Sequence, residues 1–137
     1  WPAGLQPDEA AEVFCDRWSN KFGNERCFDL CVLGMGDDCH TASMFPKGPL
    51  LSSSTTDLFA AVDVSGKGAR LTITPAGLRA SGRILVMVMG EGKAAALQRV
   101  FHGRYEPFNK PIQQLKDHAD RVTWLIDPPA AARLELE

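Results

Sequence analysis

The chain has 137 residues, of which 45% are hydrophobic and 23% are charged, and 15 Lys and Arg against 17 Asp and Glu give a formal net charge of -2. This length supports one hydrophobic core, and the composition is that of an ordinary globular protein. The slightly acidic balance excludes the broad basic surface of a nucleic-acid-binding protein. Because no apolar run reaches membrane-spanning length and no signal-like segment opens the chain, we expect one cytosolic domain with no nucleic-acid or membrane partner.

The first half of the chain predicts a helix, a buried strand and a loop. Apolar residues at helical spacing across residues 7–22, with Gly23 as a stop, indicate an amphipathic helix. Residues 28–33 form an almost continuous apolar run, which is typical of a parallel strand covered on both faces. A short helix is expected over residues 41–45, stopped by Pro46, and a Gly-, Pro- and Ser-rich loop over residues 47–56.

The second half alternates strands with helices. Residues 58–64 and 70–74 flank the turn 66–68 and predict a hairpin or a bulged connection. Thr74 as N-cap, followed by Pro75, starts a short helix that Gly82 closes. Residues 84–89 and 122–126 predict strands, and residues 91–101 and 130–136 predict helices. This order predicts one α/β domain with a layered, Rossmann-like, mostly parallel sheet and helices on both faces.

Two glycine turns follow the predicted buried strands, where open α/β sheets bind their ligands. Residues 34–40 carry two acids and His40, the first of three histidines, and residues 90–93 place Lys93 in a first helical turn. A lysine there opposes the helix dipole unless an anion lies nearby. Each feature also has a plain structural interpretation, because glycines commonly make turns and Lys93 alone is compatible with a solvated surface cation.

The remaining histidines and cysteines give no functional signal. His102 lies near a helix end and His118 in a polar loop. Cys15, Cys27, Cys31 and Cys39 lack Cys-x-x-Cys spacing, so we expect free thiols rather than zinc ligands or disulfides.

The string Gly-Met-Gly-Asp-Asp-Cys-His-Thr-Ala-Ser-Met-Phe-Pro at residues 34–46 resembles the signature of the 6-phosphogluconolactonases. Residues 70–74, 90–93 and 123–127 resemble that family's arginine-led strand, glycine-lysine turn and closing strand. The resemblance implies hydrolysis of 6-phosphogluconolactone to 6-phosphogluconate in the oxidative pentose phosphate pathway, without a metal or other cofactor. On the same resemblance, residues 1–137 correspond to the C-terminal portion of a larger α/β domain.

The resemblance also implies roles for individual residues. His40 is expected to be the general base, with Asp38 fixing its tautomer. Arg70 and Lys93 are expected to bind the substrate phosphate. We also expect four turn glycines to bind the substrate or its phosphate: Gly34, Gly36, Gly90 and Gly92.

Two departures from the family pattern keep other functions open. Cys39 stands where the family has glycine, so we expect a strained turn if that position needs positive φ. The family's further glycine-rich phosphate loop and an arginine-bearing segment are not among these residues, so we expect the isolated chain to be nearly inactive. We also expect self-association through an apolar face that the missing part would cover.

The alternatives are a non-catalytic sugar-phosphate binding domain and a sugar-6-phosphate isomerase or deaminase. In the related glucosamine-6-phosphate deaminases, the similar motif has an acid five residues after the histidine. Phe45 occupies that position here, which favours the lactonase branch.

Overall fold

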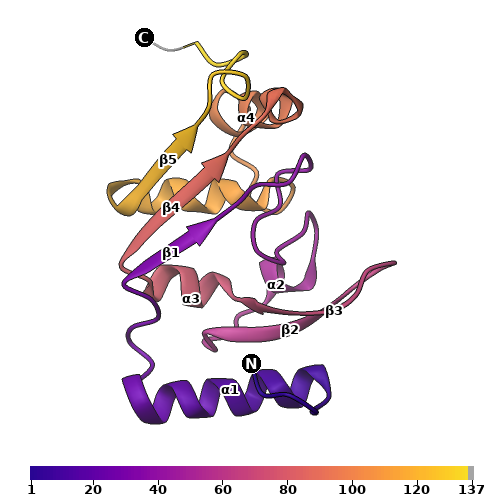
Figure 1. Cartoon of the computed structure of the whole chain (residues 1–137), viewed down its shortest axis with the longest axis vertical. Coiled ribbons are helices and arrows are strands. Elements are labelled where there is room, and N and C mark those ends of the chain that lie inside the picture. Colours follow the sequence, from indigo (N-terminus) through magenta and orange to yellow (C-terminus); the bar gives the residue numbers. More distant parts are fainter. Residues whose placement is uncertain (136–137) are drawn as a thin grey trace.

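A computed structural model describes residues 1–135 as an α/β fold with two separate sheets (Figure 1). The parallel sheet has the strand order β1-β4-β5, and these strands are Leu30–Leu33, Arg83–Val88 and Val122–Ile126. The second sheet is an antiparallel hairpin of β2 (Phe59–Val64) and β3 (Gly68–Ile73). The predicted α/β class with a mostly parallel sheet is confirmed.

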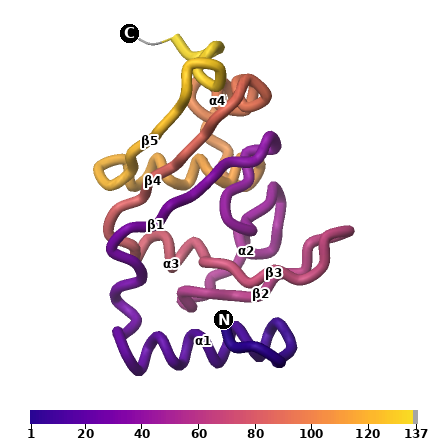
Figure 2. Tube along the Cα trace, in the orientation of Figure 1, coloured from indigo at the N-terminus to yellow at the C-terminus, as the bar shows by residue number. Residues whose placement is uncertain are grey.

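Helix α1 (Pro7–Phe22) packs an aromatic face against the hairpin and lies beneath it in Figure 2. The helix ends as predicted at Gly23, which has a φ of 78°. The ring centroids of Phe14 and Trp18 lie 4.8 and 5.3 Å from that of Phe59 on β2. This apolar contact fixes the hairpin beside the edge strand β1.

The parallel sheet is covered on one face only. Helix α4 (Ala94–Phe101) and the 3-10 helix η2 (Pro111–Arg121) lie on one side of it (Figure 1), and the side chains of Ile84 and Val86 are buried there. The opposite face exposes apolar side chains from all three strands: Leu30, Val32, Met87 and Leu125. Among residues 1–135, helices cover one face of the parallel sheet, and these side chains leave the other face partly exposed.

The remaining helices are short. Thr74 caps α3 (Pro75–Ala80) as predicted, since its hydroxyl oxygen accepts a bond of 3.0 Å from the backbone N–H of Gly77. The predicted helix over residues 91–101 begins as the 3-10 turn η1 (Glu91–Lys93) and continues as α4. No helix described within residues 1–135 is long and apolar enough to cross a membrane.

Four segments differ from their predictions. Residues 41–45 form a tight turn with a bridge between Thr41 and Met44 rather than a helix, because Ala42 has a φ of 49° and leaves the right-handed region. The predicted loop holds a one-turn helix, α2 (Pro49–Ser52), and η2 was not predicted. Within the helix predicted over 130–136, residues 130–135 form turns and irregular chain, and residue 136 lies outside the described residues.

Candidate active site

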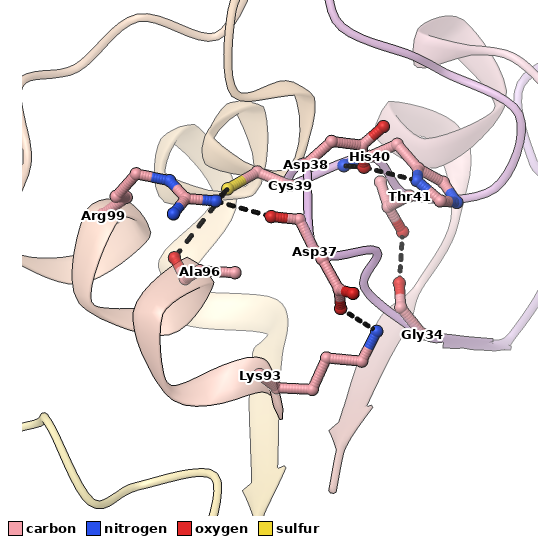
Figure 3. A network of polar contacts seen from close by, with 9 residues as sticks. All are labelled: Gly34, Asp37, Asp38, Cys39, His40, Thr41, Lys93, Ala96 and Arg99. Atoms are coloured by element: carbon pink, nitrogen blue, oxygen red, sulfur yellow. Dashed lines mark hydrogen bonds and ion pairs between the residues drawn. The ribbon is translucent and has the colours of Figure 1, made fainter. Parts of the chain in front are cut away.

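The two glycine turns lie at the carboxyl ends of neighbouring parallel strands, as predicted. Strand β1 pairs directly with β4, with Leu33 opposite Val86, so residues 34–40 and 90–93 leave the same edge of the sheet. A salt bridge of 2.6 Å joins Lys93 Nζ to Asp37 Oδ1 (Figure 3). Two segments far apart in sequence therefore meet at one place.

The turn after β1 is tightly closed by its own backbone. The N–H of Gly36 donates to the carbonyl of His40, and the N–H of Cys39 donates to the carbonyl of Gly36, both at 2.9 Å. The hydroxyl of Thr41 adds a bond of 2.9 Å to the carbonyl of Gly34. A Cβ at Gly36 would lie 2.1 Å from His40 Nδ1, so only glycine lets the imidazole fold back over the turn.

Asp38 and His40 form a closely bonded pair. Asp38 Oδ1 accepts 2.6 Å from His40 Nδ1 and 3.0 Å from the backbone N–H of His40 (Figure 3). Partial burial opposes ionisation of Asp38, but these two bonds and the nearby imidazole outweigh burial and hold the pKa of Asp38 below its ordinary value of 3.8. Because an ionised carboxylate only accepts hydrogen bonds, Nδ1 carries the proton and Nε2 of a neutral ring is left as a proton acceptor.

Phe45 covers one face of the His40 ring. The two ring centroids are 4.4 Å apart with an interplanar angle of 28°. Lys67 Nζ, from the hairpin turn, lies 5.1 Å from the centroid of the Phe45 ring. Phe45 and Lys67 also line a pocket of about 390 Å³ between the hairpin and residues 43–50. The aromatic ring therefore restricts the imidazole and separates it from this pocket.

Cys39 adopts the strained conformation that the sequence raised as a possibility. Its φ is 67°, in the left-handed region that glycine prefers, and its side chain is fully buried at 0% exposure. Sγ lies 3.8 Å from the carbonyl oxygen of Ala96 and 3.9 Å from Arg99 Nη2. The cysteine is thus accommodated by α4.

Arg99 and Asp127 are contacts of the site that the sequence did not predict. Arg99 Nη2 donates 2.5 Å to the backbone carbonyl of Asp37 (Figure 3). The carboxylate of Asp127, at the end of β5, accepts 2.9 and 3.1 Å from the N–H of Gly90. That N–H group is therefore already bonded, and Gly90 does not offer it to a ligand in this conformation.

The other predicted binding residues make no hydrogen bond or ion pair with the Asp38–His40 pair among residues 1–135. Gly92 lies in η1, and Arg70 is an exposed residue of β3 whose Nη1 donates 3.3 Å to the carbonyl of Ala69. Among residues 1–135, this bond to Ala69 is the hydrogen bond found for the Arg70 side chain, and no acidic residue of the site pairs with it. The convergence of Arg70 and Lys93 on one anion stays a prediction. Within the same residues, no group of three or more His, Cys, Asp or Glu is arranged to hold a metal ion.

Comparison with known proteins identifies relatives over most of the chain. The model of the family described as glucosamine-6-phosphate isomerases/6-phosphogluconolactonase matches residues 2–124. The human 6-phosphogluconolactonase is 36% identical over 135 residues, covering 95% of this chain and 51% of the relative. The chain thus spans about half the length of such relatives.

Solved structures of a 6-phosphogluconolactonase and of a glucosamine-6-phosphate deaminase share the fold. The crystal structure of a 6-phosphogluconolactonase from Shewanella baltica OS155 has a TM-score of 0.75 at 23% identity, covering 91% of this chain and 53% of that one. A monomeric glucosamine-6-phosphate deaminase has a TM-score of 0.67 at 22% identity, covering 89% and 54%. The fold alone therefore does not separate the two activities.

Proposed function

Because the chain belongs to the glucosamine-6-phosphate isomerase/6-phosphogluconolactonase family, we propose that it provides the general-base part of a 6-phosphogluconolactonase. The Asp38–His40 pair at the end of β1 carries the proposal. Its imidazole has one nitrogen held by a carboxylate, and no hydrogen bond to the other nitrogen is found within residues 1–135. The substrate would be a phosphorylated sugar lactone.

The proposed reaction is water attack on the lactone carbonyl. His40 Nε2 takes a proton from water as the water oxygen bonds to C1, and the carbonyl oxygen becomes an oxyanion. When the oxyanion collapses, the bond from C1 to the ring oxygen breaks, and the ring oxygen takes the proton as the new hydroxyl. Asp38 stabilises the imidazolium that exists between these steps, without itself taking the proton.

For the phosphate we propose Lys93 and Arg70, with Gly34, Gly36 and Gly92 allowing close backbone approach. Lys93 has to exchange its bond to Asp37 for the phosphate. That exchange is plausible because Asp37 is largely exposed, with 75% of its side chain accessible, and an exposed ion pair contributes little stability. A dianionic phosphate is the stronger partner for the ammonium.

Phe45 favours the lactonase over an amine-eliminating isomerase or deaminase. Its ring stacks on His40 at the position where the deaminase pattern has an acid. An apolar ring there cannot pass on a proton, so a ring-opening relay through that position has no counterpart. The strained Cys39 supports the second candidate, a non-catalytic sugar-phosphate binding domain.

The deciding experiment is a 6-phosphogluconolactone hydrolysis assay on the polypeptide that carries these residues, corrected for spontaneous ring opening. Hydrolysis that depends on His40 is expected. Binding of 6-phosphogluconate without hydrolysis would instead support the binding-domain candidate. Release of ammonia from glucosamine 6-phosphate would support the deaminase.

Three further points belong to the proposal. We propose that residues 1–137 alone are nearly inactive, since they hold the substrate from one side only and loose positioning loses much of the proximity effect. We propose a cytosolic location. We also propose that the open apolar face of the parallel sheet drives self-association of the isolated chain.

A further inference from the structure

We propose that Arg99 is a positioning residue for the catalytic turn, an inference that rests on the proposed function of His40. Arg99 lies in the last turn of α4, and its Nη2 reaches both the carbonyl of Asp37 and the thiol of Cys39 (Figure 3). The arginine makes no contact with His40 in the described structure. It acts by fixing the backbone of the residues that precede the histidine.

The turn needs such a brace because its own conformation is unfavourable. Cys39 is a non-glycine residue in the left-handed region, which is costly for a side chain with a Cβ. The turn cannot relax by moving Cys39 outward without exposing a buried thiol and breaking the bond from the N–H of Ile112 to the carbonyl of Cys39, which is 3.1 Å long. Contacts from outside the turn therefore hold the strained residue in place.

Helix α4, which carries Arg99, is itself held in place by buried side chains. Leu97 and Val100, on either side of Arg99, are buried at 0% and 1% exposure. A charged donor to a backbone carbonyl also forms a stronger hydrogen bond than a neutral donor. The guanidinium consequently links the packed face of a helix to the backbone two residues before Cys39.

A plainer role for Arg99 is that of a surface cation that complements the negative end of the α4 dipole. Arg79 provides a matched control, because it is an exposed arginine in the last turn of α3. No hydrogen bond from the Arg79 side chain is found among residues 1–135. If Arg99 acted only through the helix dipole, Arg79→Ala and Arg99→Ala would have similar effects on amide exchange in the turn.

The test measures amide hydrogen exchange at Gly36 and Cys39, whose N–H groups close the turn. We expect Arg99→Ala to speed exchange at both by at least about tenfold, with the urea unfolding midpoint nearly unchanged. We expect the double variant Cys39→Gly/Arg99→Ala to exchange like Cys39→Gly alone, because glycine needs no brace. Arg79→Ala should exchange like the wild type.

Activity supplies a second, separate readout in the polypeptide that carries these residues. Arg99→Ala should lower kcat by about 10- to 100-fold with KM nearly unchanged, and much less in the Cys39→Gly background. A wild type without lactonase activity would refute the proposed function while the exchange data still test the brace.

Three results would overturn the positioning role. They are unchanged exchange in Arg99→Ala, global unfolding of that variant alone, and equal effects of the arginine substitution in the Cys and Gly backgrounds.

Discussion

At the scale of single residues, the orientation of His40 depends on two neighbours of different chemistry. Asp38 holds Nδ1 at 2.6 Å, and the ring of Phe45 covers one face of the imidazole. Only 28% of the His40 side chain is accessible. In the proposed mechanism the reacting water approaches from the Nε2 side, so these contacts give the proposed base a defined direction.

His40→Ala should remove the base. We expect turnover of 6-phosphogluconolactone by the polypeptide that carries these residues to fall by about 10²–10⁴, with little change in phosphate binding. His102→Ala is the control, because this exposed histidine lies at the far end of α4. Steady-state kinetics on both variants decide the matter, and an unchanged turnover in His40→Ala would remove the assignment.

The strain at Cys39 can be isolated by two substitutions at the same position. Cys39→Gly and Cys39→Ala both lose the buried thiol, but only glycine relieves the left-handed φ of 67°. We expect the glycine variant to be more stable than the alanine variant by about 1 kcal/mol in urea unfolding. Equal stability would mean that the backbone tolerates the cysteine without strain.

The sequence pointed to the residues to which we assign the chemistry and missed the long-range contacts of the turns that hold them. His40, Asp38 and Lys93 lie in short motifs after strands, and these motifs together with the family resemblance made them candidates. Arg99 and Asp127 bond to backbone groups 62 and 37 positions away. Contacts of that kind leave no local pattern, because any side chain with the right reach could make them.

At the scale of elements, the turn between β1 and the 41–45 segment depends on one glycine. Gly36→Ala would place a Cβ 2.1 Å from His40 Nδ1 and 2.6 Å from Asp38 Oδ1. The imidazole has to move, so we expect activity to fall by about 10²-fold. Gly34→Ala, whose Cβ would meet nothing within 4 Å, should leave the imidazole in place and alter KM rather than kcat, because Gly34 is proposed to lie beside the substrate phosphate. Kinetics in which both alanines behave alike would contradict this role.

Elements with local signals were predicted well, and elements without them were not. Helix α1, the β2-β3 hairpin and the Thr74 cap follow from periodicity, turn glycines and capping chemistry. The 41–45 segment was assigned to a helix because nothing in the sequence reveals that Ala42 takes a φ of 49°. The 3-10 helix η2 was missed because its sequence from Pro111 to Arg121 is mostly polar and begins with a proline, which is also typical of a loop.

At the scale of the whole molecule, stability should decrease in alkali through a buried thiol. Burial raises the pKa of Cys27 from 9.0 to about 11, so the folded state keeps its proton longer than the unfolded state. The contribution of this thiol to the free energy of unfolding is therefore fully present below pH 9 and is lost as pH rises through 11. Urea midpoints measured across this range should decline less steeply in Cys27→Ala. An identical slope in that variant would assign the alkaline loss to other groups.

The open face of the parallel sheet gives a second prediction at this scale. Leu30 and Val32 are each 55% exposed, although parallel strands are normally covered on both faces. We expect residues 1–137 to associate in sedimentation experiments, and Val32→Lys to shift the chain toward the monomer. Gln98→Lys, on exposed α4 surface, should leave association unchanged. A chain that is monomeric at all concentrations would contradict the proposed self-association.

The pairing of β1 with β4 also determines when the site can form during folding. Leu30 lies opposite Arg83, and the intervening chain holds the hairpin and α3. The hairpin can form early from near neighbours, whereas β1 and β4 pair only after a long loop has closed. The contact between Asp37 and Lys93 is therefore formed by a non-local event. Any unfolding route that first separates these two strands destroys the site while much of the secondary structure persists.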